Sequence, residues 1–82
     1  MKYVLVKKMK DNVGNALEHI QPGDDFCWEI DGGTHTAKAK DEVRFAFKIA
    51  LRDIAAGETV LCYGEPIGTA TTAIASGECV HV

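Results

Sequence analysis

The sequence predicts a mainly β domain of short strands joined by tight turns and short helical turns. Three observations favour this fold class. Apolar residues alternate over residues 43–51, glycines interrupt the chain at short intervals, and one turn pattern occurs three times. Alternation with a period of two places one set of side chains on one face of a strand, whereas glycine and proline favour turns.

Length and composition limit the classes of protein that the chain can belong to. We expect a single domain over residues 1–82. A chain of this size buries only about 60–65% of its unfolded surface, so we expect self-association into a homo-oligomer. The formal net charge of −3 indicates no nucleic-acid partner. Without an apolar leader or an apolar span, we expect no membrane partner and a cytoplasmic location.

The first half of the chain predicts a strand, a short helix and a hairpin. Residues 2–7 form a short apolar run with lysines at its ends. Apolar residues recur at helical spacing after Asp11, which is a good N-cap residue, so residues 12–19 predict a helix. Residues 26–40 predict a hairpin with its turn at residues 31–33, because consecutive glycines adopt positive φ readily.

The second half predicts the central strand and its continuation. Residues 43–51 alternate strictly, and residues 52–57 then predict one helical turn closed by a glycine. A strand is expected at residues 59–63. Residues 65–68 predict a kinked loop, because their proline has no N–H to donate to a strand ladder. The last strand is expected at residues 78–82.

An internal repeat of the form Ile-x-x-Gly-acid-x-apolar begins at Ile20, Ile54 and Ile74. Each copy predicts an isoleucine in the core, a glycine that reverses the chain, an acidic residue in solvent and the start of a strand. The unequal spacing of the copies argues against a solenoid.

The three cysteines give little sign of a covalent or metal site. Cys27, Cys62 and Cys79 are odd in number, and no CxxC motif occurs. Each lies in a strand-like stretch, which predicts small buried side chains. Only Cys79 has a base nearby, because alternation places it on the same strand face as His81.

Several segments of the chain occur in a specific order and spacing. They are Asp11-Asn12-Val13, Lys48-Ile49-Ala50-Leu51, Asp53-Ile54, Gly57-Glu58, Tyr63-Gly64-Glu65-x-Ile67-Gly68-x-Ala70 and Gly77-Glu78-x-Val80-His81-Val82. Together they resemble the SAF domain of the altronate and galactarate dehydratases, which also occurs as a small subunit in sulfolactate sulfo-lyase. The resemblance covers nearly the whole chain and implies a β-clip fold, a long hairpin folded on itself with a short helix.

The resemblance implies the small subunit of a sugar-acid dehydratase-like lyase that is inactive alone. Such a subunit would contribute lid or carboxylate-binding groups to an active site shared with a large subunit. The alternative is a non-catalytic SAF-type module for binding or assembly. The scattered histidines and the small size predict no metal or other cofactor bound by this chain alone, and leave a divalent metal to the complex.

Dehydration of a sugar acid needs a base, an acid or metal for the departing hydroxyl, and a cation for the carboxylate. The resemblance makes Lys48 the candidate cation, and His81 is a candidate acid, base or metal ligand. From the pattern alone, Lys48 also fits a solvent-facing lysine and His81 an exposed histidine near a terminus. Asn12 is a candidate ligand for a substrate hydroxyl or a residue of the first helical turn. Tyr63 and Gly64 complete the substrate-binding candidates.

The sequence departs from the family pattern in three places. Ala46-Phe47-Lys48 stands where the family usually has Gly-His-Lys, and Gly14 stands where alanine is common. The family pattern also continues into a second histidine and an asparagine, whereas this sequence stops at Val82. Phe47 in place of the histidine favours the non-catalytic module, and the near full-length match favours the lyase.

Overall fold

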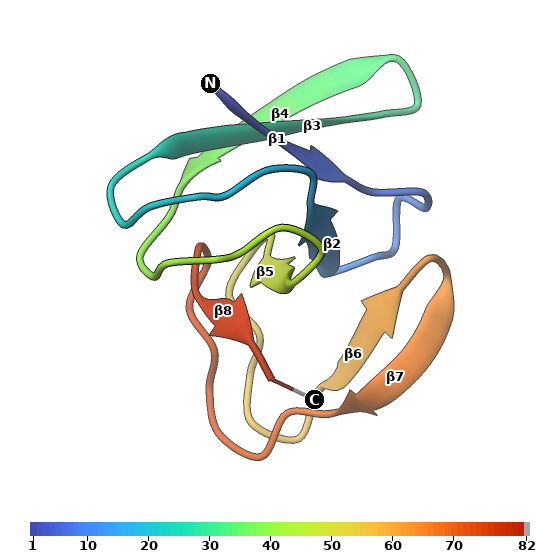
Figure 1. Ribbon diagram of the computed structural model, residues 1–82. Helices are drawn as coiled ribbons and strands as arrows, with labels where there is room; N and C mark the ends of the chain where they lie inside the picture. The colour runs from blue at the N-terminus through green and yellow to red at the C-terminus, as the bar shows by residue number, and fades with distance from the viewer. Residues whose placement is uncertain (82) are drawn as a thin grey trace.

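The computed structural model describes residues 1–81, which form β-strands and contain no helix (Figure 1). The mainly β fold class is therefore confirmed, although the short helical turns are absent from these residues. The strands are β1 (Lys2–Leu5), β2 (Val13–Ala16), β3 (Asp25–Ile30), β4 (Gly33–Lys38), β5 (Lys48–Ala50), β6 (Thr59–Cys62), β7 (Glu65–Thr69) and β8 (Cys79–Val80).

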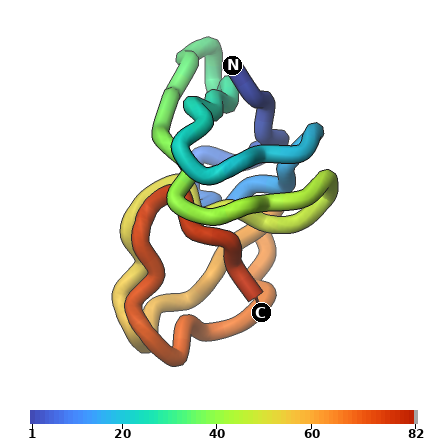
Figure 2. The backbone as a smooth tube through the Cα atoms, turned by 60° about the vertical axis from the view of Figure 1, so that its left-hand side comes forward, coloured from blue at the N-terminus to red at the C-terminus, as the bar shows by residue number. Residues whose placement is uncertain are grey.

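Two sheets organise the molecule. The larger sheet has the order β4-β3-β1-β2-β5-β8, and the smaller sheet is the hairpin β6-β7. Within the larger sheet β1 pairs with β3 in parallel, and the other pairs are antiparallel. Figure 2 shows the β3–β4 hairpin and the β6–β7 hairpin at opposite ends of the molecule, with the short central strands between them.

The two hairpins belong to two halves of the chain with the same connections. In the first half, Ile20 and Val43 form an isolated antiparallel bridge on either side of the β3–β4 hairpin. In the second half, Ile54 and Ile74 form the same bridge on either side of the β6–β7 hairpin. The repeats that begin at Ile20 and Ile54 thus start at equivalent points, just before a hairpin. The repeat that begins at Ile74 starts just after the second hairpin.

The main-chain hydrogen bonds at the base of each hairpin repeat as well. The N–H of Gly23 donates to the carbonyl of Ala39 at 2.8 Å, and the N–H of Gly57 donates to the carbonyl of Ala70 at 2.7 Å. Both glycines have positive φ, 89° and 86°. The unequal spacing in the sequence arises because the first interval, from Ile20 to Ile54, also contains Val43, the bridge partner of Ile20, whereas the second interval, from Ile54 to Ile74, spans one hairpin.

The turn pattern has a fourth copy, which the sequence does not reveal. The chain reverses at Ala46 with φ of 71°, as it does at Gly77 with φ of 88°. The Ala46 N–H donates to the carbonyl of Ala16, and the Gly77 N–H donates to the carbonyl of Ala50. Alanine rarely adopts this conformation, so its presence hides the turn from a reading based on glycine.

The predicted strand over residues 43–51 is therefore wrong for most of its length. Only β5 is a strand, and the residues before it form the turn at Ala46. Phe45 and Phe47, predicted to share one face of the strand with the other apolar residues, lie in the turn and are 65% and 51% exposed. The turn happens to place apolar residues at every second position, which imitates the period of a strand.

The predicted helix over residues 12–19 is also wrong, because β2 occupies this segment. β2 lies between β1 and β5, and a Cβ at Gly14 would collide with the side chains of Val4 and Val6. In this chain the valine side chains of β1 and the residue after it thus leave no room for a Cβ at Gly14, and tertiary pairing overrides the helical spacing. Leu17, expected on the apolar face of the helix, is 48% exposed.

Two shorter predictions are corrected as well. Residues 52–57 form a bend, the Ile54 bridge and a tight turn in place of the predicted helical turn. Residues 65–68 belong to β7, where the proline is tolerated because the ladder shifts register between Val60 and Leu61. The first strand, the hairpin at residues 26–40 and the strand near residue 60 are confirmed. β8 covers part of the predicted last strand, of which Val82 lies outside the described residues.

The acidic residue of the turn pattern does more than face solvent. The carboxylate of Glu58 accepts the N–H of Ala55 at 2.9 Å, and the carboxylate of Glu78 accepts the N–H of Ala75 at 2.6 Å. Each carboxylate thereby satisfies a main-chain donor at the start of its turn, which explains the acidic position of the repeat.

Two small cores lie on either side of the central strands. Side chains of β2 and β5 alternate between them: Ala16 and Ile49 pack into the core of the first half, and Val13 and Ala50 into that of the second. Because the same two strands serve both cores, the halves cannot separate without exposing both.

The strained turn gives a prediction about stability. Replacing Ala46→Gly removes about 1 kcal/mol of strain that the left-handed conformation imposes on alanine. Glycine also raises the conformational entropy of the unfolded chain, which lowers the free energy of unfolding by about 0.4–1 kcal/mol. We expect a small net gain in the free energy of unfolding, measured by urea denaturation. The matched control is Ala56→Gly in an equivalent turn, where φ is negative, and this change should destabilise. Equal losses in both variants would contradict the strain at Ala46.

Candidate functional site

The candidate site lies where β5 and β8 pair at the edge of the larger sheet. Lys48 is directly opposite Val80 in this antiparallel pair, and His81 follows immediately. The pairing therefore brings the main chain of Lys48, the predicted cation, next to that of His81, the predicted acid or base. Of the residues predicted for the site, these are the two that the structure brings together.

Two hollows, both open to solvent, share His81 as part of their walls. One is lined by Ala46, Phe47, Lys48 and Val80 together with His81, and has a volume of about 530 Å³. Its walls thus combine an ammonium group, an imidazole and a phenyl ring. An acidic ligand placed here would meet Lys48 and His81 at the same time.

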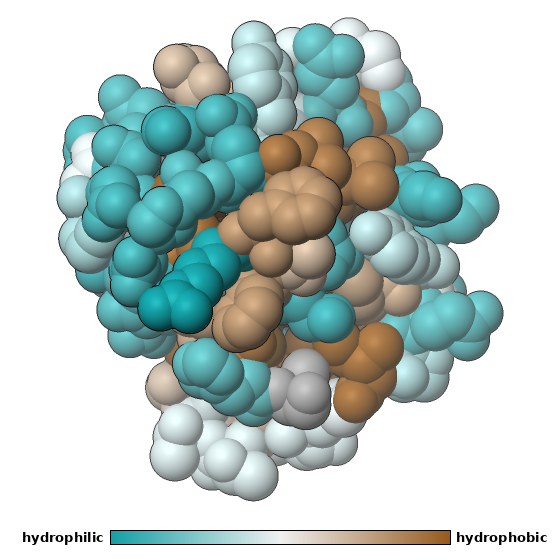
Figure 3. All heavy atoms as spheres, in the orientation of Figure 1, coloured by the Kyte–Doolittle hydropathy of each residue, from teal (hydrophilic) through white to brown (hydrophobic). Residues whose placement is uncertain are grey.

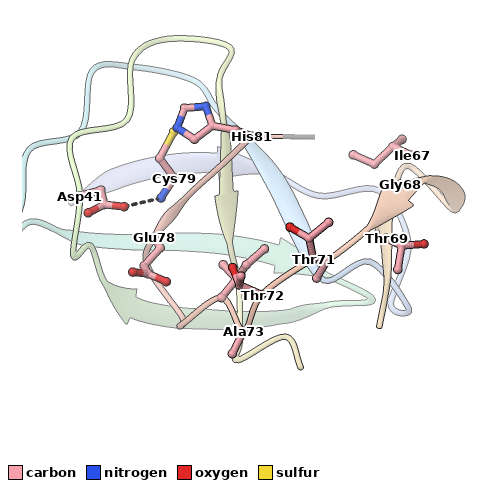
Figure 4. Close-up of a pocket in the computed structure, with 12 residues that line it drawn as sticks. Asp41, Ile67, Gly68, Thr69, Thr71, Thr72, Ala73, Glu78, Cys79 and His81 are labelled. Carbon is pink, nitrogen blue, oxygen red and sulfur yellow. Dashed lines mark hydrogen bonds between the residues drawn. The ribbon is translucent and has the colours of Figure 1, made fainter. Parts of the chain in front are cut away.

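The second hollow has a volume of about 500 Å³ (Figure 4). Thr71 and Thr72 contribute hydroxyl groups from the segment after β7, and the hollow is also lined by Cys79 of β8 and by His81, which follows β8. Asp41 also lines it and accepts the N–H of Cys79 at 3.0 Å, as the dashed line in Figure 4 shows. The hydroxyl groups suit a polyhydroxylated ligand, because each can donate and accept a hydrogen bond.

Lys48 stands in a small network of polar side chains. Asn15 lies opposite Lys48 in the pairing of β2 with β5. The Asn15 side chain donates from Nδ2 to the carbonyl of Ala46 at 2.9 Å, and its Oδ1 accepts the thiol of Cys62 at 3.4 Å. Within residues 1–81, Lys48 takes part in none of the ion pairs. Its charge is thus available to an anion.

Burial raises the pKa of the Cys62 thiol, although the Lys48 ammonium nearby opposes this effect. Burial also raises the pKa of the Cys79 thiol, and the carboxylate of Asp41 adds to the increase. A nucleophilic cysteine needs a lowered pKa. The two thiols therefore serve as packing groups and weak donors, in agreement with the interpretation from the sequence.

Asn12 lies away from both hollows and is 1% exposed. Its Nδ2 donates to the carbonyl of Thr59 at 2.9 Å, and its Oδ1 accepts the N–H of Leu61 at 2.8 Å. Both ends of the amide are thus bonded to β6. The structure gives Asn12 an internal role, which replaces the helical first turn considered as its alternative.

Tyr63 and Gly64 form the tight turn between β6 and β7, with φ of 55° and 79°. Their N–H groups donate to the buried carboxylate of Asp11 at 3.0 Å and 2.7 Å. The Lys7 ammonium lies over the Tyr63 ring, at a distance of 5.1 Å from the ring centroid. Neither residue lines the hollows around His81.

The sequence missed four residues around the site: Asn15, Asp41, Thr71 and Thr72. Asn15 was hidden by the helix predicted for its segment, since a helix places it on a different face from that in a strand. The two threonines follow a stretch predicted as a loop, and only the pairing of β7 with β6 brings them near β8. Asn15 lies two residues after Val13 and so shares its face of β2, and a polar side chain at this spacing from a buried valine was the one available signal.

Within residues 1–81, no three histidine, cysteine, aspartate or glutamate side chains come together as metal ligands. The donors around His81 do not form a cation site by themselves. The same residues include no helix long and apolar enough to span a membrane.

The fold and the site define a small β-sheet module that presents a cation and an imidazole in open hollows. The chain matches the family described as the altronate/galactarate dehydratase SAF domain over residues 1–82. The chain belongs to this family.

Three relatives show two ways in which the domain occurs. The chain is 37% identical to the altronate dehydratase of Escherichia coli (strain K12) over 81 residues, covering 99% of this chain and 15% of that protein. It is 34% identical to the altronate dehydratase of Bacillus subtilis (strain 168) over 82 residues, covering 100% of this chain and 16% of that protein. The chain thus spans about a sixth of these relatives.

The third relative is close to this chain in length. The (2R)-sulfolactate sulfo-lyase subunit alpha of Chromohalobacter salexigens is 42% identical over 81 residues, covering 95% of this chain and 86% of the relative. Its name describes a subunit, so in that protein the domain works with at least one other chain.

The buried amide gives a prediction about stability. Asn12→Ala leaves the Leu61 N–H and the Thr59 carbonyl without their partner and creates a cavity. We expect a loss of about 3 kcal/mol in the free energy of unfolding, measured by urea denaturation. Gln21→Ala, at an exposed position, should change stability by less than about 0.5 kcal/mol. A loss below 1 kcal/mol for Asn12→Ala would show that the amide is not needed to hold β6.

The raised thiol pKa values predict a loss of stability in alkali. The folded state keeps these thiols protonated to a higher pH than the unfolded state, whose thiols ionise near their ordinary pKa of 9.0. The unfolded state therefore binds fewer protons, and the free energy of unfolding should fall as pH rises above about 9. Urea denaturation at pH 7, 9 and 10 measures the effect, and Cys62→Ala/Cys79→Ala should reduce it. An unchanged slope in the variant would contradict the assignment to these thiols.

Proposed function

We propose that this chain is the small component of a sugar-acid lyase of the dehydratase type, with an active site completed by a larger polypeptide. The observation that carries the proposal is the pairing of β5 with β8, which places Lys48 beside Val80 and His81 at a shared wall of two hollows. Family membership and the lyase names of its relatives support the reaction class.

Lys48 is assigned to the carboxylate of the substrate. Removal of a proton beside a carboxylate develops enolate charge on its oxygens, and a fixed ammonium group stabilises that charge. Lys48 is suited to this role because β5 holds its backbone between β2 and β8, and no ion pair within residues 1–81 neutralises it.

His81 is assigned to proton transfer. An imidazole ring can act as a general base toward the proton beside the carboxylate or as a general acid toward the departing hydroxyl. Thr71 and Thr72 line the hollow on the other side of His81 and are assigned to hydrogen bonds with substrate hydroxyls. These roles require no metal on this chain, and a divalent metal in the complex would be held by the partner.

The larger polypeptide is proposed from the openness of the site and from the relatives. Neither hollow encloses a ligand, and elimination needs a site from which bulk water is excluded. The sulfo-lyase relative is named as a subunit, and the altronate dehydratases contain about six times the length of this chain. We therefore expect the chain to be inactive alone.

A second candidate function is a non-catalytic module for binding or assembly. It is favoured by Phe47, which stands at the family's histidine position and presents an apolar ring to the same hollow as Lys48. In that case the fold and the partner are retained, and the substitution has removed a polar group from the site.

The two candidates are separated by an activity measurement on the complex. The chain is co-expressed with the dehydratase-type large polypeptide of its own genome and assayed on a panel of sugar acids and sulfolactate. Lys48→Ala and His81→Ala should each lower kcat/KM by about 10²–10⁴-fold. Lys40→Ala, at an exposed lysine, is the control and should leave it unchanged. Full activity in both site variants would favour the non-catalytic module.

A further inference from the structure

The four equivalent turns of the fold provide an internal comparison. Three of them have proline, alanine or serine before the reversing glycine and an acidic residue after it, whereas the fourth has a phenylalanine at both positions. The four sets are Pro22-Gly23-Asp24, Ala56-Gly57-Glu58, Ser76-Gly77-Glu78 and Phe45-Ala46-Phe47. Because the same turn forms elsewhere in the molecule without an aromatic residue at either position, the two rings are not required by the turn.

The phenylalanine turn is costly for the isolated domain. Phe45 and Phe47 are 65% and 51% exposed, and Ala46 between them adopts φ of 71°. Exposed rings contribute little to folding, and the left-handed alanine adds strain. Strain retained beside exposed aromatic groups is typical of a functional surface.

The rings belong to a wider apolar surface. Tyr3, Leu5 and Leu17 are also exposed, at 57%, 36% and 48%. Main-chain bonds connect this set to the turn, since Leu17 donates to the carbonyl of Tyr3 and Ala46 donates to the carbonyl of the residue before Leu17. Figure 3 shows one face of the molecule, with apolar side chains gathered across its middle. We call these five apolar residues, with Arg44, the aromatic face.

The charges next to the rings indicate the character of the partner. Arg44 precedes Phe45 and Lys48 follows Phe47, and neither takes part in an ion pair within residues 1–81. An apolar groove with an acidic rim would therefore match the turn. In a symmetric contact between two copies, the same cations would face each other, which disfavours a second copy of this chain at this position.

We propose that the aromatic face is the docking surface for the larger lyase polypeptide, with Phe45 and Phe47 inserted into an apolar groove rimmed by acidic residues. This inference rests on the proposed function and adds the place of contact. Phe47 lines the same hollow as Lys48 and His81. Docking at this turn therefore covers the hollow and closes the proposed site with the partner.

The test measures binding and activity separately on the co-expressed complex. Phe45→Ser/Phe47→Ser should weaken binding of the large polypeptide at least 100-fold, because buried aromatic anchors dominate such interfaces. Arg44→Glu should weaken it by a smaller factor through repulsion from the acidic rim. The matched control is Met9→Ser, which removes a side chain that is 59% exposed and lies in a different hollow. Circular dichroism of each variant alone checks that the fold is retained.

The outcomes distinguish docking from chemistry. Unchanged affinity in Phe45→Ser/Phe47→Ser and in Arg44→Glu would overturn the docking surface, whatever the activity of the complex. Loss of activity with full binding in His81→Ala would support the proposed function independently. Sedimentation showing that the phenylalanine variants change self-association of this chain, but not binding of the large polypeptide, would also overturn the proposal in favour of a second copy.

Discussion

Two buried polar side chains, Asp11 and Asn12, attach the second half of the chain to the first. The Asp11 carboxylate accepts three main-chain N–H groups, from Lys8, Tyr63 and Gly64. Burying a polar group without partners costs several kcal/mol, so these side chains are stable only when β6 and the following turn are in place. The requirement works in both directions, because the same bonds fix the position of the β6–β7 hairpin.

This attachment determines where the candidate site forms. With the second hairpin held against β2, the chain returns through the Ile74 bridge and adds β8 to the free edge of β5. Lys48 and His81 then become neighbours although they are far apart in the sequence. The duplicated halves thus produce one site, at the end of the sheet where the second half closes.

The site and the aromatic face depend on the same short strand. β5 carries Lys48, and the turn that leads into β5 carries the exposed phenylalanines. The turn at Ala46 is held by hydrogen bonds from its N–H to Ala16 and from Asn15 to its carbonyl. A partner that contacts this turn would therefore meet a rigid surface directly beside the cation and the imidazole, which suits a function that requires two chains.

The sequence by itself determined the mainly β class, three of the four glycine-type turns, the first hairpin and the family. These features rest on local chemistry: glycine permits positive φ, alternation marks paired strands, and the family motifs have fixed spacing. Tertiary structure decided the rest. The segment predicted as a helix is the strand β2, because it pairs with β1 and packs Gly14 against Val4 and Val6. Most of the predicted central strand is a turn, because a main-chain hydrogen bond to Ala16 holds Ala46 in a conformation that alanine rarely adopts. The meeting of Lys48 with His81, and the burial of Asn12 away from them, depend on pairings between distant segments, which no local pattern encodes.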